Sequence, residues 1–145
     1  MAVSNPAKQI IVKNDAGANL NAATLAADDN TTGVKMGTYK TFGFWIDISA
    51  STGTSETLDI TFEWSEDSTN GVNGTWAAIV EFIDGKRTAQ AMAQITTTTG
   101  AFATYFLNPC SSKGYVRAKL DTGGTSPVYT IDNAYWVLKD AAQQR

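Results

Sequence analysis

The chain has 145 residues, a net charge of -3 and a charged fraction of 17%. This length suits one domain that buries about two-thirds of the surface its unfolded form exposes, so neither a disulfide nor a metal is needed for folding. The acidic balance, without a basic cluster, argues against nucleic acid as the main partner. No apolar run approaches the roughly 20 residues that cross a bilayer, so we expect no membrane partner.

The residue counts narrow the chemistry further. Histidine is absent, although it is the usual general base near neutral pH and the commonest metal ligand. A Ser-His-Asp triad and a conventional zinc site are therefore excluded, and we expect no enzyme activity, no cofactor and no metal. The single cysteine, Cys110, cannot form an internal disulfide, which is typical of folding in a reducing cytoplasm.

The N-terminal segment is poor in large apolar side chains. Its stretch GANLNAATLAADDNTTG is rich in Ala, Asn and Asp, a composition that contributes little to a core. We expect residues 1–35 to form a loosely structured arm with one short strand at IIVKN, and residues 36–145 to form a single β-sandwich domain. Because such an arm gains order by lying on a partner, Ile10, Ile11 and Val12 are candidate interface residues.

From residue 41 onward, apolar side chains alternate with polar ones, the period of a half-buried strand. The sets that share a face are Phe42, Phe44, Ile46 and Ile48; Leu58, Ile60, Phe62 and Trp64; Val116, Ala118 and Leu120; and Tyr129, Ile131, Tyr135 and Val137. Trp45 falls on the face opposite Phe44, which makes it a further candidate interface residue. The segment WAAIVEFI is apolar at both parities and is expected to be a strand covered on both faces; AFATYFL supplies another strand.

Turn signals separate these strands. SASTGTSE, DSTNGVNG, DGKR, NPCSSKG and DTGGTSP carry the Gly, Asn and Pro that tight turns require. No long amphipathic helix is predicted, and RTAQAMAQI is compatible with one or two helical turns, a strand or a loop. Short strands separated by such turns predict an all-β fold, an antiparallel sandwich or barrel.

The stretch EWSEDSTNGVNGTW resembles the Asp-box loop of sialidases, with Ser65-x-Asp67 followed by Gly74-Thr75-Trp76. That resemblance implies sugar chemistry. However, the spacing from Asp67 to Trp76 is longer than in an Asp box, and the motif occurs once, whereas propellers repeat it from blade to blade. We therefore interpret the stretch as a hairpin loop in which Asp and Asn satisfy turn backbone groups.

The acidic residues show neither the spacing of a calcium site nor the arrangement of a catalytic one. Asp28, Asp29, Asp67 and Asp84 lack the fixed ligand spacing of a calcium loop, and nothing in the sequence places them where burial would raise a pKa for acid–base catalysis. We interpret them as solvated turn residues.

Three stretches together resemble the small β-sandwich structural proteins of tailed bacteriophages, particularly capsid decoration or cement proteins. They are YKTFGFWIDISASTGTSETLDITF, EWSEDSTNGVNGTW and GYVRAKLDTGGTSPVYTI, and the resemblance covers roughly residues 39–138. It implies a jelly-roll-like sandwich, often trimeric, that binds the major capsid protein on the outer surface of the virion after synthesis in the host cytoplasm. It brings no catalytic residues. The apolar stretches WAAIVEFI and AYWVL also favour a homotrimer.

Two alternatives come from other classes of protein. The four tryptophans would suit a stacking platform in a carbohydrate-binding or receptor-binding β-sandwich module of a phage tail or fibre. A small hydrolase that works with carboxylates alone is disfavoured by the absence of histidine.

Overall fold

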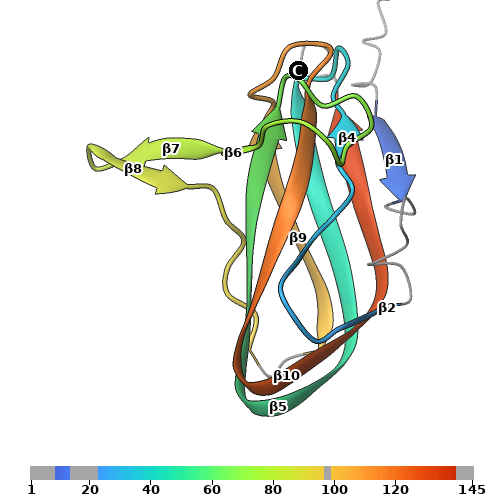
Figure 1. Ribbon diagram of the computed structural model, residues 1–145, viewed down its shortest axis with the longest axis vertical. Helices are drawn as coiled ribbons and strands as arrows, with labels where there is room; N and C mark the ends of the chain where they lie inside the picture. The colour runs from blue at the N-terminus through green and yellow to red at the C-terminus, as the bar shows by residue number, and fades with distance from the viewer. Residues whose placement is uncertain (1–8, 14–22, 97–98, 140–145) are drawn as a thin grey trace, which may run out of the picture.

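The computed structural model describes residues 9–13, 23–96 and 99–139. These residues form strands, turns and loops, and none of them lies in a helix long and apolar enough to cross a membrane. The strands in chain order (Figure 1) are β1 (Gln9–Lys13), β2 (Ala23–Leu25), β3 (Asp29–Asn30), β4 (Val34–Lys35), β5 (Thr41–Ser65), β6 (Ala77–Ala78), β7 (Val80–Ile83), β8 (Lys86–Ala89), β9 (Gly100–Leu107) and β10 (Tyr115–Lys139).

Two 25-residue strands, β5 and β10, form the frame of the fold. They pair antiparallel from Thr41↔Lys139 to Ser65↔Tyr115, and both bend back on themselves at the same end of the molecule (Figure 1). The stretch SASTGTSE, expected to be a turn between two strands, continues the ladder through this bend. Register shifts relax the pairing there, and Gly124 takes a φ of 97°, where a Cβ would lie 2.6 Å from the Ser55 carbonyl oxygen.

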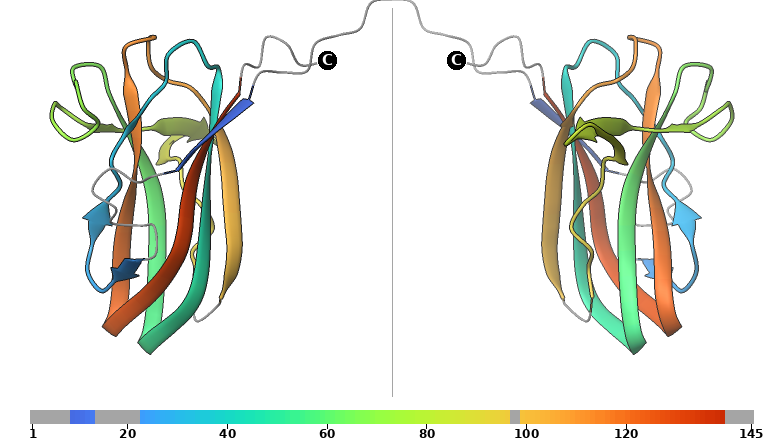
Figure 2. Two further views of the ribbon diagram at one scale, coloured as in Figure 1. Left: turned by 90° about the vertical axis from the view of Figure 1, so that its right-hand side faces the viewer. Right: turned by 90° about the vertical axis from the view of Figure 1, so that its left-hand side faces the viewer.

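The bend turns one sheet into two facing layers (Figure 2). Layer A has the order β1, C-terminal half of β10, N-terminal half of β5, β9; β2 continues the β1 edge. Layer B has the order β3 and β4, N-terminal half of β10, C-terminal half of β5, β6. Two antiparallel layers that share their two central strands in this interleaved order are a jelly-roll arrangement, which confirms the predicted all-β sandwich.

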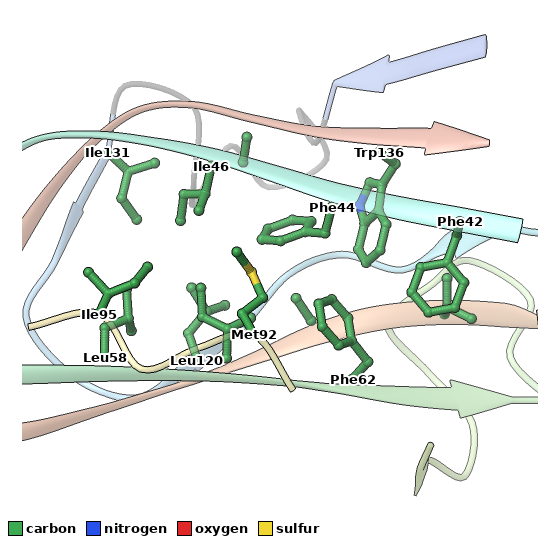
Figure 3. Close-up of a cluster of buried hydrophobic side chains, with 14 of the residues drawn as sticks. Phe42, Phe44, Ile46, Leu58, Phe62, Met92, Ile95, Leu120, Ile131 and Trp136 are labelled. Atoms are coloured by element: carbon green, nitrogen blue, oxygen red, sulfur yellow. The ribbon is translucent and has the colours of Figure 1, made fainter. Parts of the chain in front are cut away.

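The core lies between the layers. Phe42, Phe44, Phe62 and Trp136 point toward one another there (Figure 3), with ring centroids 4.8 Å apart for Phe44 and Trp136 and 5.7 Å apart for Phe42 and Phe62. Three of the predicted faces are confirmed, because Phe42, Phe44, Ile46, Ile48, Leu58, Ile60, Phe62, Val116, Ala118 and Leu120 are all buried. Trp64 is half-buried and packs against this core.

The predicted face of the last strand is wrong in its second half. The alternation placed Tyr135 and Val137 with Tyr129 and Ile131, yet Trp136 and Leu138 belong to the core cluster instead, and Val137 is buried outside that cluster. A register shift between Ile131 and Asn133 explains the change. A bulge adds one residue to the strand, so every later side chain moves to the opposite face.

The segment WAAIVEFI is not one strand covered on both faces. It breaks at Ile79: β6 pairs with β5, whereas β7 pairs with β8 in a separate two-stranded sheet. The Ile79 N–H donates to the Phe62 carbonyl and the Ile79 carbonyl accepts from the Gln90 N–H, at 2.9 and 2.8 Å. RTAQAMAQI forms no helical turn; after β8 it runs along β5 through isolated bridges at Ala91 and Ile95.

The N-terminal segment holds more strand than expected. Within residues 1–35 the described ranges contain four short strands, β1 to β4, instead of one, and all four pair with β10. Leu25 is buried in the core cluster. The buried Thr31 bonds to the backbone of Ala118 in both directions, through its own N–H and its hydroxyl oxygen. This segment of small polar residues therefore forms strands by hydrogen bonding to the backbone at the free edge of β10. The division at residue 35 stays a prediction.

Candidate functional site

Exposed apolar side chains gather on the outer face of layer A. Of the large apolar residues that the structure describes, Trp45, Tyr105 and Leu107 are 43%, 44% and 73% exposed, and Val72 in a distant loop is 63% exposed. The first three lie on neighbouring strands, β5 and β9, where Trp45 pairs with Ala103, and Gly43 pairs with Tyr105. We call Trp45, Tyr105 and Leu107 the outer-face patch.

The Tyr105 ring at the centre of the patch is held in place. It lies over Gly43, where a Cβ would collide with the ring. The Trp45 indole N–H donates to the Tyr105 hydroxyl at 2.9 Å, and the Lys139 ammonium lies 4.6 Å from the centroid of the Tyr105 ring. Because the aromatic pair is already fixed, binding there loses little side-chain entropy. Ordered Trp and Tyr side chains of this kind are frequent anchors of protein interfaces.

Trp45 is exposed on the face opposite Phe44, as the sequence predicted. The other predicted interface residues lie in the same layer, because β1 is separated from β5 only by β10. Ile10, Ile11 and Val12 pair with Leu138, Val137 and Trp136. The structure thus brings β1 and Trp45 into one sheet. Whether these residues form an interface stays a prediction.

Sequence reasoning missed Tyr105 and Leu107. In AFATYFL, these two residues lie on one face of the strand and Phe102 and Phe106 lie on the other, so both faces carry large apolar side chains. In the structure Phe102 and Phe106 pack against the core, half-buried, and the opposite parity is exposed. The alternation alone does not say which of two apolar parities faces solvent.

The side chains of the Asp-box-like loop make their hydrogen bonds within the loop. Asp67 Oδ1 accepts from the Ser65 hydroxyl at 2.8 Å and from the Thr75 N–H at 2.7 Å, and these bonds, the Thr75 bond first, lower the pKa of Asp67. Asn73 Oδ1 accepts from the Thr69 N–H and the Ser68 hydroxyl. The loop joins β5 to β6, which pair antiparallel. The hairpin interpretation is confirmed, and the polar side chains of the loop stabilise its own backbone.

Trp76 at the end of this loop also makes its contacts within the protein. Its indole N–H donates to the Asn73 carbonyl at 3.1 Å, and the Arg117 guanidinium lies 4.3 Å from its ring centroid. Arg117 in turn pairs with Glu63 at 2.7 Å. A stacking platform made from all four tryptophans is therefore not formed, because Trp76 is held under a cation and Trp136 is buried in the core.

The other candidate acids make local contacts. Asp28 Oδ1 accepts from the Thr122 N–H at 2.7 Å, and Asp84 takes a φ of 50° in the β7–β8 turn. Glu56 is a buried carboxylate, 4% exposed, whose Oε1 receives one long bond from Ser51 at 3.4 Å. Within the described ranges no group of three metal-ligating side chains comes together.

Glu66 holds the turn before β10, and the Cys110 thiol lies beside this turn, 3.6 Å from the Tyr115 carbonyl oxygen. The Glu66 carboxylate accepts from the Ser111 hydroxyl and the Ser111 N–H at 2.5 and 2.6 Å. These two bonds, the hydroxyl bond first, lower the pKa of Glu66. Burial, and secondarily the Glu66 charge, raise the pKa of the Cys110 thiol to about 12. Because the thiolate is the reactive form, this thiol is a poor nucleophile at neutral pH.

No protein-family model and no curated protein sequence matches the chain. Among solved structures, it is similar to the SPBc2 prophage-derived protein YomS, with a TM-score of 0.45 and 9% identity over 96% of this chain and 99% of that chain. It is also similar to the CBM36-1 domain of a multidomain xylanase from the hindgut metagenome of Trinervitermes trinervoides, with a TM-score of 0.47 and 9% identity over 90% and 96% of the two chains.

A third similar structure holds the CBM22-1 and GH10 modules of the Clostridium thermocellum xylanase 10B, with a TM-score of 0.45 and 8% identity over 92% of this chain and 24% of that chain. All three TM-scores are below 0.5, so these likenesses carry no information about ligand, activity or partner. What the described residues establish is an antiparallel β-sandwich module with an ordered apolar patch on the outer face of one layer.

Proposed function

We propose that this chain is a capsid decoration protein, a virion structural protein that binds the outer surface of the major capsid protein shell through the outer-face patch and stabilises that shell. The observation that carries the proposal is the patch itself, in which Trp45, Tyr105 and Leu107 are exposed side by side. Adjoining exposed apolar residues mark protein interaction sites more often than single scattered ones do. The resemblance of residues 39–138 to decoration proteins supports the choice of partner.

The energetics favour docking over exposure. Burying a fully exposed large apolar side chain contributes about 1.5–3 kcal/mol. Trp45 and Tyr105 are already more than half covered, so each of them contributes less than this, and Leu107 is the patch residue with the most surface left to bury. In this proposal the chain is not an enzyme, and it has neither a cofactor nor a nucleic-acid or membrane partner. It assembles in the host cytoplasm and ends on the capsid surface. The homotrimer expected from the sequence is part of the same proposal.

Capsids that lack the protein provide the test. Purified wild-type protein and the Leu107→Asp variant are titrated onto them, and the bound fraction is measured after sedimentation. Leu107→Asp places a charge in the patch, so we expect its affinity to fall at least tenfold. Val72→Asp is the matched control, because Val72 is similarly exposed but lies outside the patch, and it should bind as the wild type does. Equal affinities for wild type and Leu107→Asp would refute docking through the patch.

Carbohydrate binding is the second candidate function. The specific observation in its favour is the exposed Trp45 ring, which a hydrogen bond to the Tyr105 hydroxyl holds in place, since sugar rings stack on exposed aromatic faces. A glycan array separates the two functions. Carbohydrate binding requires at least one glycan that quenches tryptophan fluorescence and loses its effect in Trp45→Ala. An array without such a glycan removes this candidate and leaves the capsid proposal standing.

A further inference from the structure

Among the strands that the structure describes, the β7–β8 hairpin has no third strand beside it. It projects from the sandwich (Figure 1), and among the described strands β7 and β8 pair only with each other. Glu81 and residues 84–89 are exposed. The turn is well specified, because Asp84 and Gly85 both take a positive φ, 50° and 74°, as a two-residue hairpin loop requires. A two-stranded hairpin alone is marginally stable in water, and a third strand normally completes it.

Strand β9 is an edge strand, with β5 on one side and none of the described strands on the other. It is the last strand of layer A and, in the part of the chain that the structure describes, it pairs with β5 alone. Its sequence GAFATYFL has no charge and no proline, and its ladder has no register shift. Natural proteins usually protect such an edge with Lys, Pro or a bulge. Phe102 and Phe106 also stay half-buried along this edge, so a strand added there would cover apolar surface.

The hairpin and the open edge cannot meet through the base of the hairpin, which is fixed elsewhere. Ile79 is buried and its backbone bonds to Phe62 and Gln90 on either side, so the hairpin leaves from the end of layer B and points away from the sandwich (Figures 1 and 2). Among the described strands, β1, β2, β3, β4 and β6 also pair on one side only, but none of them is longer than five residues, whereas β9 has eight. The same chain thus carries an unextended hairpin and, in β9, the longest edge on which such a hairpin can pair, so a second copy of the chain supplies what each of them lacks.

We propose that the β7–β8 hairpin docks on the open edge of β9 in a second copy of this chain. The hairpin gains its third strand and layer A of the neighbour gains a covered edge. Because β9 is uncharged, Glu81, Lys86 and Arg87 of the hairpin meet no like charge on it. The contact joins two different surfaces, so repeating it can close a ring of copies. This inference goes beyond the capsid proposal and does not depend on it.

Cysteine cross-linking in the free protein tests the contact. Thr88→Cys marks the hairpin and Ala101→Cys marks β9; both positions are exposed. Each is made in a Cys110→Ser background, mixed with the other, and treated with a bifunctional maleimide. We expect a cross-linked dimer in the mixture and none with either variant alone. A dimer from Ala101→Cys alone would show that β9 pairs with itself, and no product in the mixture would show that the two surfaces do not meet. Either result overturns the inference.

A shortened hairpin gives an independent readout. Val80 and Ala89 lie opposite each other, so joining them through Asn-Gly removes the projecting part and keeps the base. Light scattering at tens of micromolar should show an oligomer for the wild type and for Val72→Asp, and a monomer for the shortened chain with a nearly unchanged melting temperature. A monomeric wild type, or an unchanged mass after shortening, contradicts the proposal. Capsid binding plays no part in these measurements. A monomeric wild type would contradict this contact and the homotrimer, whereas docking on the capsid is tested separately by the titration of Leu107→Asp.

Discussion

The loop at residues 66–76 and the outer-face patch differ in what their side chains are free to do. The loop contains residue types that are common in binding sites, yet Asp67 and Asn73 accept hydrogen bonds from backbone N–H groups of the loop itself. The patch lies on plain strands, and its large side chains face solvent. Residue types that are common in sites therefore mark a site only when their bonding capacity or apolar surface is left open to a partner.

The largest effect expected is in the core beneath both regions. Phe62 is fully buried among aromatic rings, with Phe106 and Phe42 at 5.1 and 5.7 Å between centroids. Phe62→Ala should lower the free energy of unfolding by about 3–5 kcal/mol, as deletion of a buried aromatic ring does. Chemical denaturation measures this value. A loss below about 1 kcal/mol would contradict the packing of the two layers described above.

Replacing a glycine of the loop at residues 66–76 should lower the free energy of unfolding. Gly74 has a φ of 93°, and a Cβ there would lie 2.8 Å from the Ser68 nitrogen and from Asp67 Oδ1. Gly74→Ala should cost about 1–3 kcal/mol of unfolding free energy and leave capsid affinity unchanged. Gly37→Ala is the control, since Gly37 also has a positive φ but no atom within 4 Å of the added Cβ. Equal losses in the two variants would mean that the loop is not tightly packed.

Substitutions that affect the patch should change capsid affinity, whereas those in the loop should change stability. Gly43→Ala pushes the Tyr105 ring away from its place over the strand and breaks its hydrogen bond with Trp45, although no patch side chain is removed. We expect capsid affinity to fall several-fold. Leu107→Asp, a surface substitution, should change the unfolding free energy by no more than about 0.5 kcal/mol. If Gly43→Ala binds capsids with wild-type affinity, the order of the aromatic pair is irrelevant to docking.

The smallest effect expected is a pH dependence at Glu66. Its pKa is lowered from 4.5 by the two bonds from Ser111. A lowered pKa in the folded state means that the contribution to stability is full above the unfolded value and is lost as pH falls through the folded value. Glu66→Gln should therefore lower the denaturation midpoint slightly at neutral pH, and the difference from wild type should vanish in strong acid. A difference that persists in acid would assign the effect to packing.

The sequence predicted the parts of the fold that follow from period-two alternation. Phe42, Phe44 and Leu58 are in the core because a sandwich strand buries every second side chain. The bulge after Ile131 and the break at Ile79 were not predicted, because each depends on pairing with distant strands and neither is marked by Gly or Pro.

The site was predicted in part for the same reason. Trp45 could be found because it departs from the apolar parity of its strand. Tyr105 and Leu107 could not, because both parities of AFATYFL are apolar and only the position of β9 at the edge of layer A decides which one is exposed. The N-terminal segment was expected to hold one strand because propensity alone does not show that β10 offers a free edge to β2, β3 and β4.

Cryo-electron microscopy of capsids decorated with the purified protein tests the central claim most directly. The account predicts density for this sandwich on the outer shell, with the outer face of layer A turned toward the major capsid protein and Trp45, Tyr105 and Leu107 in contact with it. Density in which this face points to solvent would contradict docking through the patch. A capsid surface without the chain would contradict the decoration proposal as a whole.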